Sequence, residues 1–235
     1  METQSLRVLV IVDLQNDFCP GGSLGVDGGH DIVKRINDLM ASGEFDIVFV
    51  TQDWHPKNHV SYVDNHPGQN LYASVTTPYG PQVLWPRHCE QNTEGAKLHP
   101  DLNTDLINHY IHKGTDPQID SYSGFFDNGK LKETELRALI EDAAQERGLQ
   151  RSDVTVSVCG LALDFCVAAT ARDSVGLGFK TELLVDATRA VCLSPGDDIK
   201  ALRDLALQGV ILIDSRDYLV TEHKLDRVVN LNIGV

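Results

Sequence analysis

The sequence VTVSVCGLALDFCVAAT, at residues 154–170, decides the fold that we expect for this chain. Its first five residues are mostly β-branched and predict a buried strand, which Gly160 interrupts. A short turn follows, in which Asp164 is a candidate helix N-cap, and the small residues at 165–175 predict a helix packed closely against a sheet. A strand followed directly by a helix is the unit from which α/β folds are built.

Cys166 falls in the first turn of that predicted helix, just beyond the carboxyl end of the strand. Open α/β sheets bind their ligands at this edge. Free backbone N–H groups and the helix dipole favour a thiolate there, and the same N–H groups can hold an oxyanion. Taken alone, the stretch fits a catalytic nucleophile and a small buried core cysteine equally well.

The rest of the chain alternates strands and helices. Strands are predicted at 6–12, 46–51, 110–113, 181–185 and 210–213, and helices at 30–42, 102–108, 134–147 and 195–208. The first strand, helix and strand form a βαβ unit, which makes the sheet parallel. We therefore expect an α/β protein with a three-layer α/β/α architecture and a mainly parallel central sheet, formed as a single domain over residues 1–235.

Two segments depart from this alternation. The segment at about 54–100 is rich in Pro, His, Asn and Gly and is too long for an ordinary connection, so we expect a functional insertion there. The tail after Asp217 has no clear pattern.

Composition narrows the class of protein. The chain is 42% hydrophobic and 23% charged, which is ordinary for a globular protein. Its net charge of −14, without a Lys/Arg cluster, argues against nucleic acid and anionic membranes as partners. The N-terminus lacks the features of a signal peptide, and no apolar run reaches transmembrane length. Five cysteines, none in a CxxC pair, read as reduced thiols, so we expect a cytoplasmic protein.

Several predicted strands end on or next to a reactive side chain. Asp13 follows the first strand, Asp53 follows the second, and Lys113 ends the strand at 110–113. Because parallel strands end at one edge of the sheet, we expect these groups to converge with Cys166. Taken singly, Asp13 also fits a turn residue and Lys113 a solvated strand end, so both interpretations stay open.

A second set of residues suits a metal ion. In an extended segment, Asp53 and His55 lie on one face, and His88 of the WPRH segment is a candidate third ligand. His59 or Ser61 could add a further ligand, directly or through water. Histidines that only cap and hydrogen-bond within a polar loop are the competing interpretation.

Five segments resemble, in order, the motifs of the nicotinamidases, which belong to the isochorismatase-like cysteine hydrolase superfamily. They are DLQNDFCPGGSL, TQDWHP, WPRHCEQNTEGA, HKG with DSYSGFFDN, and CGLALDFCVAATARD. The resemblance runs from about residue 8 to about residue 190. Other branches of the superfamily share the Asp–Lys–Cys arrangement but lack the DxHP and WPxHC motifs.

The resemblance implies a role for particular residues on an isochorismatase-like hydrolase fold. It implies a catalytic triad of Asp13, Lys113 and Cys166, an oxyanion hole from the N–H groups of Ala162 and Cys166, substrate contacts from Phe18, Trp85 and Tyr122, and metal ligands Asp53, His55 and His88. It also implies a cis peptide between Leu161 and Ala162. Phe165 stands where relatives often have His or Tyr, so the resemblance does not imply the chemical character of the wall beside the nucleophile.

The activity implied is hydrolysis of nicotinamide to nicotinate and ammonia through a thioester, in NAD salvage. One divalent ion is implied; zinc is our first expectation, and iron and manganese also suit two His and one Asp. A homo-oligomer would be in keeping with the family. One alternative is another amide hydrolase of the superfamily. The other is a non-enzymatic metal-binding or ligand-binding protein on the same fold, which would not need Cys166.

Overall fold

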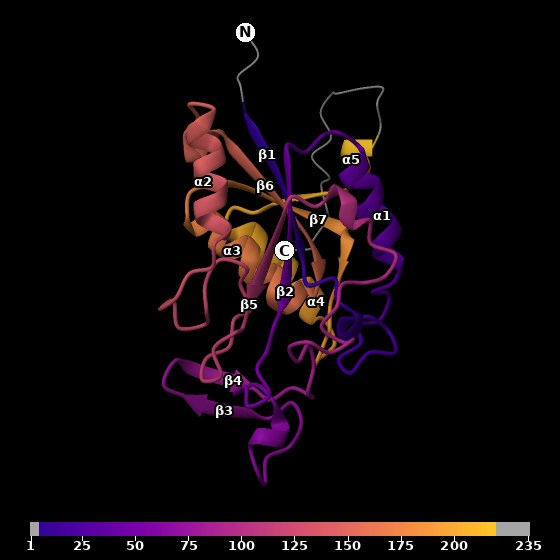
Figure 1. Ribbon diagram of the computed structural model, residues 1–235, viewed down its shortest axis with the longest axis vertical. Coiled ribbons are helices and arrows are strands. Elements are labelled where there is room, and N and C mark those ends of the chain that lie inside the picture. The colour runs from indigo at the N-terminus through magenta and orange to yellow at the C-terminus, as the bar shows by residue number, and fades with distance from the viewer. Residues whose placement is uncertain (1–4, 220–235) are drawn as a thin grey trace.

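The computed structural model describes residues 5–219, which form three layers with a twisted sheet between two sets of helices (Figure 1). The sheet has the strand order β5-β2-β1-β6-β7-β8, and every neighbouring pair is parallel. Its strands are β1 (Leu6–Val12), β2 (Ile47–Asp53), β5 (His109–Lys113), β6 (Val154–Leu161), β7 (Lys180–Arg189) and β8 (Ile211–Ile213). The predicted α/β/α architecture is confirmed.

Alternate side chains of the central strands enter two separate cores. Leu9 and Ile11 of β1 pack toward α1 (Asp31–Ala41) and α5 (Arg216–Leu219), whereas Val8 and Val10 face the opposite core. That second core is covered by α2 (Leu136–Glu146), α3 (Ala168–Gly176) and α4 (Asp197–Leu207). Because successive strand residues point to opposite faces, a continuous apolar strand is buried from both sides.

The insertion contains an element that the sequence analysis missed. Strands β3 (Ser74–Thr77) and β4 (Gly80–Val83) form an antiparallel hairpin beyond the carboxyl ends of the central strands (Figure 1). Each has only four residues, and β3 is half exposed, so their sequence carries little hydrophobic alternation. The helix predicted at 102–108 is only a 3-10 turn, and such turns occur at Asn16–Phe18, Val63–Asn65, Thr104–Leu106 and Arg151–Asp153.

Strand β7 is longer than the predicted 181–185 and continues through Asp186. The Asp186 carboxylate binds Arg35 at 2.8 Å and accepts the Ser215 amide at 2.8 Å, so it anchors α1 and the start of α5 to the sheet. Most of the unassigned tail lies outside the described residues. None of the helices in residues 5–219 is long and apolar enough to cross a membrane.

Candidate active site

The chain turns sharply after β6 and places Cys166 at the carboxyl edge of the sheet. The peptide between Leu161 and Ala162 is cis, as the resemblance implied, and a π-helical turn, Leu163–Val167, leads into α3. Cys166 therefore lies in this turn, two residues ahead of the first residue of α3. The helix predicted at 165–175 is largely confirmed.

Asp164 is not the N-cap that the sequence suggested. Ala162 occupies that position, and no side chain caps the turn. The Asp164 carboxylate instead accepts the backbone N–H groups of Val191 and Cys192, both at 2.9 Å. Asp164 thus fastens the loop after β7 beside the nucleophile.

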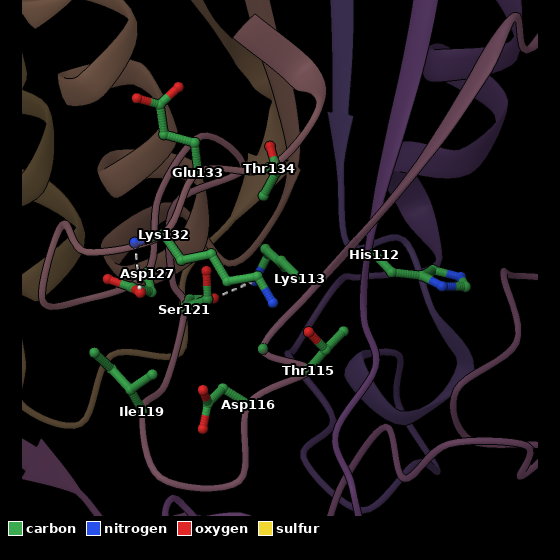
Figure 2. A pocket seen from close by; sticks show the side chains of 11 residues that line it. His112, Lys113, Thr115, Asp116, Ile119, Ser121, Asp127, Lys132, Glu133 and Thr134 are labelled. Atoms are coloured by element: carbon green, nitrogen blue, oxygen red, sulfur yellow. Dashed lines mark hydrogen bonds between the residues drawn. The ribbon is translucent and has the colours of Figure 1, made fainter. Parts of the chain in front are cut away.

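Lys113 is the centre of a fully buried charge cluster. Its Nζ lies 2.8 Å from Asp13 Oδ2 and 2.6 Å from Asp53 Oδ1, donates to Ser121 O at 2.8 Å (Figure 2), and is 3.4 Å from Cys166 Sγ. Asp53 and Lys113 are paired residues of neighbouring strands, which explains their contact. The strand ends thus bring together the three residues that the resemblance implied as a triad.

Burial and the two carboxylates set the charges of this cluster. Burial disfavours a charged amine, but Asp13 and Asp53 outweigh it and raise the pKa of Lys113 well above its usual value. Burial also opposes ionisation of Asp53, yet Lys113 and His55 hold its pKa well below the ordinary range. For Asp13 burial dominates over Lys113 and raises the pKa to about 6.

The protonation state of Cys166 differs from the expectation. Burial raises the pKa of the Cys166 thiol well above its usual value, and Lys113 only partly offsets it because Asp13 and Asp53 act in the opposite direction. Burial therefore favours the thiol over the thiolate in the resting side chain. Carboxylate oxygens of Asp13 and Asp53 and the Cys166 sulfur all lie within 4.8 Å of one another, so a base stands next to it.

Asp53, His55 and His88 come together as a candidate metal site. His55 Nε2 is 3.5 Å and His88 Nε2 is 3.9 Å from Asp53 Oδ2. Two ligands held about 2.1 Å from one ion in a tetrahedral arrangement are about 3.4 Å apart, so these distances suit a shared divalent ion.

Hydrogen bonds to the other ring nitrogens support that assignment. His55 Nδ1 is 2.8 Å from Gly114 O and His88 Nδ1 is 2.7 Å from Pro86 O, and a carbonyl can only accept. In the neutral form of each ring, Nε2 therefore carries a free lone pair, and among residues 5–219 His55 Nε2 is buried without a hydrogen-bond partner. Hydrogen bonds of this kind from the second ring nitrogen orient histidines that bind metal ions.

Two further residues, His59 and Asp120, border the candidate metal site. The His59 ring stacks on that of His55 with centroids 3.9 Å apart, and its Nε2 is also buried without a partner. His59 Nδ1 contacts Ser61 Oγ at 2.7 Å. The Asp120 carboxylate lies within 4.8 Å of the ligand atoms of His55 and His59. The sequence analysis gave Asp120 no role, although it is the first residue of the DSYSGFFDN motif.

A pocket lies between these two clusters. Phe18, Trp85 and Tyr122, the residues for which the resemblance implies substrate contacts, line it. The Trp85 indole donates to Tyr122 Oη at 3.1 Å, and Phe165 packs edge-on against Trp85 with centroids 4.8 Å apart. The remaining lining residues are Leu24, Asp53, His88, Asp120, Ala162, Cys166 and Val191. Phe165 makes the wall beside the nucleophile apolar.

A second pocket touches Lys113 and Ser121 from another direction (Figure 2). It has no Phe, Tyr or Trp in its lining and does not reach Cys166, so we assign the substrate to the aromatic pocket.

Cys19, His30 and His99 form another cluster with metal-ligand spacing, but its hydrogen bonds are already complete. The Asp101 N–H donates to His99 Nδ1 at 3.1 Å, which places the His99 proton on Nε2. His99 Nε2 then donates to His30 Nδ1 at 2.9 Å, and His30 Nε2 donates to Pro20 O at 3.0 Å. No ring nitrogen is left for an ion, in contrast to the site at Asp53.

A buried cysteine lies beside a carboxylate and a lysine at the carboxyl edge of the parallel sheet. This arrangement, on a three-layer α/β/α fold, defines the protein as a hydrolase with a cysteine nucleophile. The isochorismatase domain model matches residues 7–217, and the chain belongs to this family.

Its relatives include a nicotinamidase from Acinetobacter baylyi, which is 41% identical over 212 residues that cover 90% of this chain and 94% of the relative. A solved nicotinamidase/pyrazinamidase structure from Acinetobacter baumanii has a TM-score of 0.83 and 42% identity, covering 92% of this chain and 99% of the other. A pyrazinamidase from Pyrococcus horikoshii, solved in complex with zinc, has a TM-score of 0.68 and 33% identity, covering 88% and 98%.

Proposed function

We propose that this chain is a nicotinamidase that hydrolyses nicotinamide to nicotinate and ammonia. The observation that carries the proposal is one pocket with two chemical ends. Cys166 and the Asp13–Lys113 pair lie at one end, the Asp53, His55 and His88 cluster lies at the other, and aromatic side chains line the space between. A flat heteroaromatic carboxamide matches both ends.

Asp13 is the base that activates the nucleophile. As Cys166 Sγ attacks the carboxamide carbon, the thiol proton passes to Asp13, whose pKa of about 6 suits a base near neutral pH. Lys113 stays charged and orients Asp13. The N–H groups of Ala162 and Cys166 stabilise the oxyanion.

The same carboxyl group completes the reaction. Protonated Asp13 gives its proton to the departing ammonia, which leaves a nicotinoyl thioester on Cys166. Asp13 then removes a proton from the water that cleaves the thioester, and the thiol is restored with release of nicotinate. Asp13 passes the proton that it took from water to the departing Cys166 sulfur, so both residues end in the protonation states in which they began. Each turnover consumes one nicotinamide and one water.

Asp53, His55 and His88 would hold a divalent ion. We favour zinc, because a relative was solved with zinc and because two imidazoles and one carboxylate suit it, although iron or manganese also fits this donor set. When bound, the ion supplies an open coordination position for the pyridine nitrogen. Phe18, Trp85 and Tyr122 hold the ring plane.

We further propose that the enzyme is cytoplasmic, with one catalytic domain over residues 1–235, and that it is able to form homo-oligomers. We propose that it binds neither nucleic acid nor membranes.

The test compares three amides in an ammonia-release assay with metal-loaded protein. Benzamide has the same carboxamide and ring size as nicotinamide but no ring nitrogen. A site built around a polar contact rejects an analogue that leaves its own group unpaired, so benzamide should react at least about 100-fold more slowly in kcat/KM. Pyrazinamide keeps a matching nitrogen and should be accepted.

Adding a chelator, or making His55→Ala, should remove most of the preference for nicotinamide over benzamide. If the metal activated water or the carbonyl instead, both amides would react alike and both would stop without metal. Equal rates for benzamide and nicotinamide in the loaded enzyme would overturn the ring-anchor role. No ammonia release from any of the three would point to another amide hydrolase of the family.

A further inference from the structure

The residue after the candidate ligand His88 has an unusual backbone. Cys89 has a φ of +47°, in the left-handed region that residues with a side chain rarely adopt. Its thiol side chain is fully buried. Such a conformation persists only where its surroundings hold it, and it sets the direction in which His88 leaves the chain.

The Asp17 carboxylate stabilises this backbone conformation of Cys89. The Cys89 N–H donates to Asp17 Oδ2 at 2.7 Å, while Asp17 Oδ1 accepts the Ser23 N–H at 3.2 Å. The Cys89 carbonyl accepts the backbone N–H of His55 at 3.1 Å. One line of hydrogen bonds therefore runs from the Asp17 carboxylate through Cys89 to the backbone of His55, and it passes directly beside His88.

Gly95 leaves the space that the carboxylate fills. A Cβ at residue 95 would lie 2.0 Å from Asp17 Oδ2, and the Asp17 N–H donates to Gly95 O at 3.0 Å. The φ of Gly95 is not in the left-handed region, so its lack of a side chain is needed for this close approach and not for backbone freedom.

We propose that Asp17 is a positioning residue for the metal site. Its carboxylate fixes the Cys89 turn so that His88 and His55 face Asp53 with the spacing that a divalent ion needs. The inference rests on the proposed function, since it assigns a support to the site that holds the ion. It adds a residue that touches neither the ion nor the substrate.

Asp17→Asn tests the proposal with almost no change in shape. The amide keeps one acceptor but turns its NH₂ group toward either the Cys89 or the Ser23 N–H, so one of the two bonds is lost. We expect zinc to bind about 10–100-fold more weakly, measured by competition with a chromophoric chelator, as is typical for loss of a residue that orients metal ligands. Asp27→Asn is the matched control, because Asp27 is an exposed aspartate of the same loop.

Gly95→Ala should disturb the same hydrogen bond between Asp17 and Cys89 without changing either residue. It leaves Asp17 chemically intact but pushes its carboxylate away from Cys89, so zinc binding should weaken by a similar factor. The double variant should lose no more than the worse single variant, because both act through one contact. Gly176→Ala is the control, since a Cβ there meets nothing within 4 Å.

The rise in melting temperature on adding zinc separates positioning from general stability. A merely structural Asp17 would lower the melting temperatures of the zinc-free and zinc-loaded forms equally, whereas positioning shrinks the difference between them. If folded Asp17→Asn binds zinc with a dissociation constant within twofold of that of the original chain, the positioning role of Asp17 is overturned while the proposed function stands. Failure of the original chain to bind zinc would instead remove the metal site of the proposed function.

Discussion

Lys113 shows how strongly burial shapes the chemistry of single residues in this site. One buried ammonium faces two carboxylates, so the three side chains by themselves carry a net negative charge when both carboxylates are ionised and Cys166 is a thiol. A third anion at Cys166 is therefore disfavoured until its proton can move to Asp13. The nucleophile thus depends on a neighbouring base, as in other thiol–base pairs, with a carboxylate in the place of imidazole.

Replacing the nucleophile should separate chemistry from folding. Cys166→Ala should lower the rate of ammonia release by about 10⁴-fold or more, because no covalent intermediate can form. Metal content and the melting temperature should stay close to those of the original chain, since Cys166 is not one of the three candidate ligands Asp53, His55 and His88. Ammonia release at an unchanged rate by purified Cys166→Ala would contradict the thioester mechanism.

The pKa of Asp13 predicts the acid limb of the pH profile. Asp13 must be ionised to accept the thiol proton, and burial raises its pKa to about 6 against the opposing effect of Lys113. Hence kcat/KM should fall about tenfold per pH unit below about pH 6 and level off above it. Asp53 does not titrate in this range because its pKa is held far lower.

Metal occupancy measured at each pH is the control, since loss of the ion would also lower the rate. A flat kcat/KM between pH 4.5 and 7 with full metal occupancy would rule out Asp13 as the base.

Strand β6 is the element on which the nucleophile depends. The sequence predicted that it stops at Val158, but pairing with β1 continues, and Gly160 lies opposite Val12. Gly160 has a φ of +107°, and a Cβ there would lie 2.1 Å from the Val12 carbonyl oxygen. Only glycine lets the two strands stay paired up to the turn that presents Cys166.

Gly160→Ala should therefore destabilise the whole sheet. Backbone strain together with the clash should lower the free energy of unfolding by at least about 2 kcal/mol in urea titrations. Gly176→Ala, at the end of α3, should change it by no more than about 1 kcal/mol and in the stabilising direction. Equal effects of the two substitutions would contradict the close approach of β1 and β6.

At the scale of the whole molecule, the segment at about 54–100 and the sheet meet at the candidate metal site. Asp53 ends a central strand, whereas His88 comes from the long segment that follows β4. An ion held by both would tie the insertion to the sheet, and any ligand that binds only the folded chain stabilises it.

Zinc should accordingly raise the thermal stability of the protein. At 100 times its dissociation constant it should add about 2.7 kcal/mol, which for a chain of this size is a rise of about 5–10 °C in melting temperature. His55→Ala removes a ligand and should abolish most of the rise, which scanning calorimetry can measure. An undiminished rise in His55→Ala would place the ion elsewhere.

The sequence by itself determined the architecture and the candidate residues. Continuous apolar strands alternating with amphipathic helices allow little besides a parallel α/β/α fold, because both faces of such strands must be covered. Motifs along the chain named Asp13, Lys113 and Cys166, and the structure brings all three into one cluster. These inferences succeed because hydrophobic periodicity and local motifs are properties of neighbouring residues.

Only the tertiary structure decided how those residues act on one another. Lys113 and Cys166 are 53 positions apart, and nothing in that separation gives a distance of 3.4 Å or a buried thiol. The support of the Cys89 turn by Asp17 was equally invisible, since it joins residues 72 positions apart. Charge state and orientation depend on burial and on contacts between distant segments, and these arise only when the chain has folded.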